Sequence, residues 1–89
     1  MKRQSPGEIS CQFSLYPLRQ ARITPTLEAV VHELDQTQVD YEVGSMSTLL
    51  RGDEEQVFES LRRAFHAAAV TGDAVLVATV SNGCPAKAD

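Results

Sequence analysis

Alternating apolar and polar positions predict a strand near the start of the chain. Over residues 9–17 the odd positions are mainly apolar and the even positions are mainly polar, as in a strand that buries one face. The odd positions before the proline are Ile9, Cys11, Phe13 and Leu15. Because Pro17 has no N–H to donate to a ladder, we expect the strand to end there.

Two later segments have the apolar spacing of amphipathic helices. In the first, Thr24 and Pro25 supply an N-cap and a proline at the first helical position. Its apolar stripe consists of Leu27, Val30, Val31 and Leu34. The second helix follows Gly52 and Asp53, and its stripe consists of Val57, Phe58, Leu61, Ala64, Phe65 and Ala68. We expect both helices to pack against a sheet through these stripes.

The remaining segments complete a strand and helix order. Residues 40–43 and 46–51 are predicted to form a hairpin around Gly44 and Ser45. After a helix end and turn at residues 71–73, the nearly continuous apolar run 74–80 predicts a buried strand. The order βαββαβ is that of the ferredoxin-like fold of the α+β class, an antiparallel four-stranded sheet with two helices on one face. We predict one such domain over residues 9–85, with tails at residues 1–8 and 86–89.

Composition and charge exclude several functional classes. The formal net charge is -4 and the eight Lys and Arg residues are scattered, so we expect no nucleic-acid partner. No apolar run approaches the roughly 20 residues that span a bilayer, so we expect no membrane insertion and a cytoplasmic location. His32 and His66 lie off the helix stripes, and we expect no metal and no other cofactor.

The two cysteines and the uncovered side of the sheet lead to two further expectations. Cys11 and Cys84 form no CxxC motif, and we expect both to be reduced, although antiparallel pairing of the first and last strands would bring them close. With both helices on one side, the open sheet face is expected to be partly apolar. We therefore expect a homodimer or a higher symmetric oligomer through the open sheet face.

Several ordered segments resemble the landmarks of YkoF-type domains. They are Phe13-Ser14-Leu15-Tyr16-Pro17, Ser47-Thr48-Leu49-Leu50-Arg51-Gly52, Val57-Phe58, Phe65-His66-Ala67-Ala68 with Thr71-Gly72, and Ser81-Asn82-Gly83-Cys84-Pro85. The resemblance, over about residues 9–85, implies a ferredoxin-like domain that binds thiamine or hydroxymethylpyrimidine without catalysis, in thiamine salvage or precursor uptake. The family's namesake carries the domain twice in tandem and this chain carries it once, so a homodimer would have to rebuild that arrangement.

A pocket for an aminopyrimidine needs hydrogen-bond donors, acceptors and apolar or aromatic walls. The candidate ligand-binding residues in or near the matching segments are Gln12, Ser14, Tyr16, Glu42, Ser47, Thr48, Ser81 and Asn82. Each also has a structural alternative, since strand hydroxyls often bond locally or face water and a tyrosine at a strand end often packs. The scattered positive charge predicts a preference for thiamine forms without a diphosphate.

Two other functions remain open at this point. A regulatory or protein-interaction module would explain the fold and its open face equally well. An acylphosphatase-like enzyme would need a phosphate-binding loop with an arginine; Arg19 and Arg22 follow the first strand, but glycines that would let the backbone wrap a phosphate are missing there. No catalytic pairing is evident from spacing, and we expect no enzymatic activity.

Overall fold

The computed structural model describes residues 7–19, 22–45 and 47–83. The elements are β1 (Glu8–Leu18), α1 (Thr24–Thr37), β2 (Asp40–Val43), β3 (Thr48–Asp53), α2 (Glu54–Thr71) and β4 (Asp73–Ser81). This order is the predicted βαββαβ order, and the ferredoxin-like fold class is confirmed.

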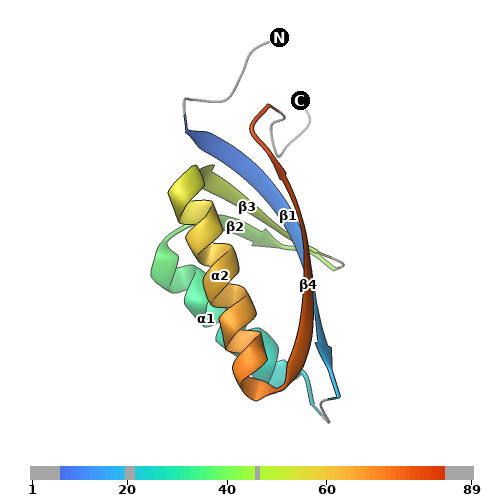
Figure 1. Ribbon diagram of the computed structural model, residues 1–89. Helices are drawn as coiled ribbons and strands as arrows, with labels where there is room; N and C mark the ends of the chain where they lie inside the picture. The colour runs from blue at the N-terminus through green and yellow to red at the C-terminus, as the bar shows by residue number, and fades with distance from the viewer. Residues whose placement is uncertain (1–6, 20–21, 46, 84–89) are drawn as a thin grey trace.

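The four strands form one sheet in the order β2-β3-β1-β4, and every neighbouring pair is antiparallel. Both helices lie on one face of this sheet, and β1 and β4 are its long strands (Figure 1). In the register, Phe13 of β1 lies opposite Thr48 of β3 on one side and opposite Ala78 of β4 on the other. The predicted sheet and its single helical layer are therefore confirmed.

The hydrophobic core lies between the sheet and the helices. The odd positions Ile9, Cys11 and Phe13 of β1 are buried, as the alternation predicts. The other buried apolar residues are Val30, Leu34, Val39, Leu50, Val57, Leu61, Ala64 and Ala68. Because side chains alternate across a strand, the even positions of β1 belong to the open face.

The first strand runs past the proline that was predicted to end it. Pro17 lies inside β1 opposite Ala74, and the strand continues to Leu18. The ladder between β1 and β3 stops at Phe13, so beyond that residue β1 has a partner only on its β4 side. A proline is tolerated where one side of a strand has no ladder to complete.

Two other boundaries also differ from the predictions. The α1 helix begins at Thr24 with Ile23 as its N-cap and no side-chain cap, so Thr24 does not cap the helix. The third strand runs from Thr48 to Asp53 because its ladder extends to the pair between Asp53 and Glu8. Asp53 then caps α2, its carboxylate accepting the Gln56 N–H at 2.7 Å.

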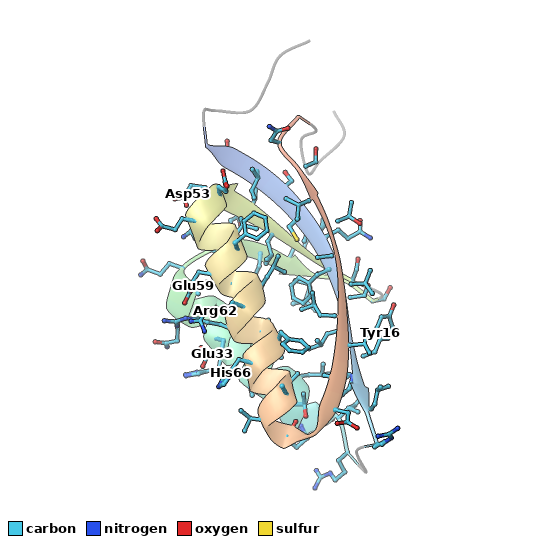
Figure 2. All side chains as sticks on the ribbon, viewed as in Figure 1. Tyr16, Glu33, Asp53, Glu59, Arg62 and His66 are labelled. Carbon is cyan, nitrogen blue, oxygen red and sulfur yellow. The ribbon has the colours of Figure 1, made fainter. Side chains whose placement is uncertain are left out.

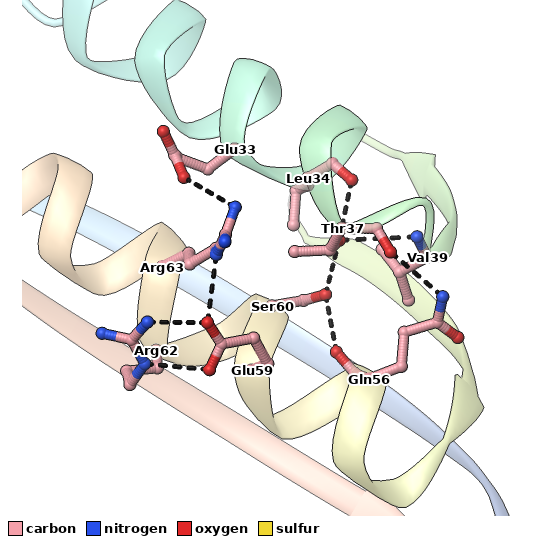
Figure 3. Close-up of polar contacts among 9 residues, drawn as sticks. All are labelled: Glu33, Leu34, Thr37, Val39, Gln56, Glu59, Ser60, Arg62 and Arg63. Atoms are coloured by element: carbon pink, nitrogen blue, oxygen red, sulfur yellow. Dashed lines mark hydrogen bonds and ion pairs between the residues drawn. The ribbon is translucent and has the colours of Figure 1, made fainter.

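The helix stripes were only partly predicted. Leu27, Phe58 and Phe65 are 42%, 48% and 43% exposed, whereas Thr26 and Ser60 are buried. The helices pack against each other as well as against the sheet, which turns the buried arc of each helix toward its neighbour. The buried hydroxyls are paired there: Ser60 Oγ lies 2.8 Å from Thr37 Oγ1 (Figure 3), and Thr26 Oγ1 lies 2.9 Å from Thr71 Oγ1.

A charged network lies on the outer side of the two helices. Glu59 accepts hydrogen bonds from Arg62 (Nη2 at 2.6 Å) and from Arg63 (Nε at 3.0 Å), and Arg63 Nη1 lies 3.5 Å from Glu33 of α1 (Figure 3). The hydrogen bonds from Arg62 and Arg63 lower the pKa of Glu59 from 4.5 to about 2. A lowered carboxyl pKa contributes stability above its ordinary value, and this contribution is lost as the pH falls toward the folded value.

Replacing Glu59 with glutamine should therefore cost a little stability at neutral pH and almost none in strong acid. The melting temperature of the wild type should exceed that of Glu59→Gln at pH 7. The gap should close as the pH falls from about 4.5 toward about 2. Thermal denaturation across this range measures the gap. Glu55→Gln removes the same charge from the same helix without touching Arg62 or Arg63, and an equal pH-dependent gap in that variant would contradict the assignment.

Candidate functional site

A pocket of about 260 Å³ lies between α1, β1 and the β2–β3 hairpin. We call it the α1–hairpin pocket. Its lining residues are Phe13, Ser14, Leu15, Pro17, Ile23, Leu27, Val30, Val31, Leu34, Val43, Gly44, Ser45, Ser47 and Thr48. The ladder of β3 on β1 stops at Phe13, while β1 continues to Leu18. The pocket therefore forms where α1 extends past the end of the hairpin.

The pocket combines apolar walls with hydroxyl groups at the hairpin. Thr48 lies opposite both Phe13 and Val43, so its side chain is on the helix side of the sheet. The Gly44 N–H donates to the Ser47 carbonyl at 2.8 Å, which closes the hairpin. None of the described lining residues carries a charge. Such a pocket suits a small neutral ring with groups that donate and accept hydrogen bonds.

The structure separates the candidate residues into two groups. Ser14, Ser47 and Thr48 line the α1–hairpin pocket. Ser14 does so from an open-face position of β1 opposite Val77, so its backbone borders the pocket. The candidates that the structure does not bring to this pocket are Gln12, Tyr16, Glu42, Ser81 and Asn82.

The second group lies on or beside the open sheet face. Glu42 pairs with Leu49, which pairs with Gln12 across the sheet. Tyr16 points away from the helices (Figure 2) and is 53% exposed. Ser81 lies opposite Ser10, at the end of the β1–β4 ladder that is far from Tyr16. Asn82 follows the end of β4 and is exposed.

The open face is partly apolar, as predicted, and it also carries charged residues. Its cross-strand rows include Asp40 opposite Arg51, whose Nη1 lies 3.5 Å from the Asp40 carboxylate. Its apolar residues are Tyr16, Leu18, Leu49, Val75 and Val77. The predicted self-association through this face stays a prediction, and these residues are the apolar surface available for it.

Sequence reasoning missed several residues that form the pocket. Ser45 was treated as a turn residue, and Leu27 and Val31 were assigned to the core stripe of α1. Val31 is half-buried and Leu27 is exposed because both border the pocket rather than the sheet. The available signal was the difference in predicted strand length, since the neighbour of the first strand in this sheet order, predicted over residues 46–51, is too short to run beside all of residues 9–17.

The other chemical candidates occupy different surroundings. Arg19 donates to the Asp73 carboxylate at 2.7 Å, an exposed ion pair across the β1–β4 end of the sheet, and Arg22 is exposed. His66 is exposed beside Glu33 and Arg62 (Figure 2), and His32 is exposed on α1. Within residues 7–19, 22–45 and 47–83, no three His, Cys, Asp or Glu side chains gather as metal ligands would.

Cys11 is buried opposite Val80, and burial raises the pKa of its thiol. The first and last strands do pair antiparallel, but Cys84 lies outside the described residues, so its approach to Cys11 stays open. No helix in the described part of the chain is long and apolar enough to span a bilayer.

Comparison with known families decides what kind of domain this is. The model of a family described as the YKOF-related family matches residues 8–87. The chain belongs to the YKOF-related family. The resemblance inferred from the ordered segments is thereby confirmed for nearly the whole domain. No curated protein matches the sequence.

Solved structures share the fold of this YKOF-related domain. A domain of unknown function, DUF77, from Bacillus cereus superimposes with a TM-score of 0.76 at 22% identity, over 89% of this chain and 83% of that one. A Streptococcus pneumoniae protein gives 0.78 at 19% identity, covering 85% and 87%. A Thermotoga maritima protein provisionally assigned to thiamine biosynthesis or salvage gives 0.72 at 15% identity, covering 89% and 90%. At these identities the likeness establishes the fold alone.

Proposed function

We propose that this YKOF-related domain binds thiamine or its hydroxymethylpyrimidine moiety without catalysing a reaction, in thiamine salvage or precursor uptake. The observation that carries the proposal is the uncharged α1–hairpin pocket, with apolar walls and hydroxyls at the hairpin. Membership of the YKOF-related family and the similar fold of the Thermotoga maritima protein also support it.

The pocket matches the chemistry of an aminopyrimidine. The ring would lie against apolar walls such as Phe13 and Leu27, and the hydroxyls of Ser47 and Thr48 can accept from an amino group or donate to a ring nitrogen. The volume of about 260 Å³ is just below the roughly 300–1,000 Å³ of sites for drug-sized ligands. We therefore place the pyrimidine ring in the pocket and the rest of thiamine at its mouth.

The charge of the pocket bears on which thiamine form is preferred. With no charged residue among the described lining residues, a diphosphate would find no cationic partner there. We propose a preference for thiamine and hydroxymethylpyrimidine over thiamine diphosphate. A tighter dissociation constant for the diphosphate would contradict this preference.

Calorimetric titration tests the proposal directly. Saturable binding of thiamine and of hydroxymethylpyrimidine at one ligand per chain, but not of a thiazole fragment or an unrelated aminopyrimidine, is the expected result. Thermal denaturation with the same ligands provides a second readout, since a ligand that binds only the folded state raises stability by mass action. No heat and no stabilisation at millimolar ligand would overturn the proposal.

Replacing Thr48 with valine should weaken pyrimidine binding about three- to tenfold, the loss expected for one hydrogen bond between neutral groups. Valine keeps the shape of threonine and removes only the hydroxyl. Thr79→Val is the matched control because Thr79 lies on the open face opposite Gln12. Equal dissociation constants for Thr48→Val and the wild type would remove Thr48 from the site.

The same proposal includes a cytoplasmic location and self-association through the open sheet face, where Tyr16, Leu49, Val75 and Val77 would supply the apolar contact. A protein-interaction module is the second candidate function. The exposed apolar residues on both sides of β4 favour it, among them Phe65 and Val77. Absence of ligand binding together with stable self-association would favour this second function.

A further inference from the structure

An open groove of about 400 Å³ lies on the flank of α1, next to the α1–hairpin pocket. We call it the α1 flank groove. Its lining residues are Thr24, Leu27, Glu28, Val31, His32 and Asp35. Leu27 and Val31 also line the α1–hairpin pocket, so the two hollows adjoin at these side chains. A ligand longer than one ring can extend from the pocket into the groove.

The α1 flank groove faces away from α2. Glu33 is on the flank of α1 that faces α2, because Arg63 Nη1 lies 3.5 Å from its carboxylate (Figure 3). At 3.6 residues per turn, Glu28 and Asp35 lie about 140–160° around α1 from Glu33. Tyr41 of β2 donates to the Asp35 carboxylate at 2.6 Å. The groove therefore opens at the β2 side of the molecule.

The groove has an apolar floor with a carboxylate at each end. Glu28 and Asp35 are two helical turns apart, about 10 Å along α1, and Val31 lies between them. No lysine or arginine is among the lining residues, and neither carboxylate forms an ion pair within the described part of the chain. Such a surface suits a cationic ring, whose face can pack on the apolar floor while its charge is attracted by both carboxylates.

We propose that the α1 flank groove binds the cationic thiazolium ring of thiamine, which makes intact thiamine, and not hydroxymethylpyrimidine, the preferred ligand. This inference rests on the proposed function, which places the pyrimidine ring in the α1–hairpin pocket. One methylene group joins the two rings of thiamine, so a pyrimidine in the pocket keeps the thiazolium close to the pocket mouth. From there the thiazolium reaches the groove across Leu27 and Val31, which line both hollows.

The charges of the groove also select between forms of the ligand. A phosphate ester on the hydroxyethyl arm of the thiazolium ring would bring negative charge near Glu28 and Asp35, and like charges disfavour binding. A neutral ring of the same shape would keep the apolar contact and lose the attraction. Because an exposed ion pair contributes little in water, the two carboxylates together should raise the affinity about five- to tenfold.

A neutral analogue of thiamine isolates the contribution of the charge. Replacing the charged ring nitrogen with carbon gives an uncharged ring of nearly the same shape. In calorimetric titrations, the wild type should bind thiamine about five- to tenfold more tightly than this analogue, and more tightly than hydroxymethylpyrimidine. The ratio between thiamine and the analogue should fall as the salt concentration rises from about 50 to about 500 mM, because salt screens exposed charges.

Charge-removing variants assign the effect to the groove. Glu28→Gln and Asp35→Asn should each weaken thiamine binding about two- to fivefold and leave the neutral analogue and hydroxymethylpyrimidine unaffected. Asparagine keeps an oxygen that can accept from the Tyr41 hydroxyl, so the charge is removed and the contact is kept. Glu33→Gln is the matched control because it removes the same charge from the flank of α1 that faces α2. The ratio between thiamine and the analogue should not change in this control.

Hydroxymethylpyrimidine separates failure of this inference from failure of the proposed function. If hydroxymethylpyrimidine binds but thiamine and its neutral analogue bind equally, the groove does not hold the thiazolium ring, and the proposed function stands. A thiamine preference that Glu33→Gln lowers as much as Glu28→Gln would also overturn the inference, since the overall charge of the protein would then be the cause. Absence of binding by every ligand, hydroxymethylpyrimidine included, would overturn the proposed function and this inference with it.

Discussion

Replacing Leu50 with alanine should lower the free energy of unfolding by about 2–5 kcal/mol, the range for truncating a buried leucine in a packed core. Leu50 is 0% exposed, and on β3 it lies between Cys11 of β1 and Tyr41 of β2. Small domains are stable by only about 5–15 kcal/mol, so this loss is a large fraction of the total. Denaturation by urea, followed by circular dichroism, measures it.

Leu49→Ala is the matched control for this substitution. Leu49 is the adjacent residue on the same strand, but its side chain is on the open face between Gln12 and Glu42, and it is half-buried. Its truncation should cost clearly less than that of Leu50. A one-residue slip of register would exchange the two faces, so an equal or larger loss for Leu49→Ala would contradict the register of β3.

The elements of the fold were predictable because their signals are local. The period of two in the first strand places Ile9, Cys11 and Phe13 on one face, and all three are buried. The hairpin at Gly44 separates two strands, and the turn before β4 separates a helix from a strand, two segments whose periods differ. The end of β1 was not predictable in this way, because tolerance of Pro17 depends on where the neighbouring strand β3 begins to pair.

The helix stripes were less informative. A stripe indicates which side of a helix is apolar, but it does not indicate how far the sheet extends beneath that side. Leu27 and Phe65 belong to apolar stripes, yet both are exposed. Leu27 extends beyond the hairpin and borders the α1–hairpin pocket, whereas Phe65 lies on an exposed part of α2. A stripe residue outside the core, such as Leu27, can therefore mark a pocket.

Three of the eight candidate residues, Ser14, Ser47 and Thr48, line the pocket, and the alternation of side chains along the strands explains where most of the others lie. Ser47 and Thr48 belong to a matching segment and line the pocket. Gln12 and Tyr16 also belong to or adjoin a matching segment, but the alternation that buries Phe13 turns them to the open face. A site between α1 and the sheet cannot use their side chains, whereas a site on the open face could.

Filling the α1–hairpin pocket is expected to abolish ligand binding. Val31 is half-buried and lines the pocket from α1, so Val31→Trp would place an indole in a space of about 260 Å³. Overpacking a closed core strains the fold, but this side chain borders open space, so the melting temperature should change little. Calorimetric titration with hydroxymethylpyrimidine should then show no heat of binding.

The same substitution at an exposed position separates occlusion of the pocket from a general effect of the indole. Val70 is 71% exposed on α2 and does not line the pocket, so Val70→Trp should bind the pyrimidine with the affinity of the wild type. If Val31→Trp also kept that affinity, the ligand would have to bind elsewhere, and the open-face residues Gln12 and Tyr16 would become the leading candidates. Alanine substitutions of Gln12 and Tyr16 would then be expected to weaken binding, while Thr48→Val would leave it unchanged.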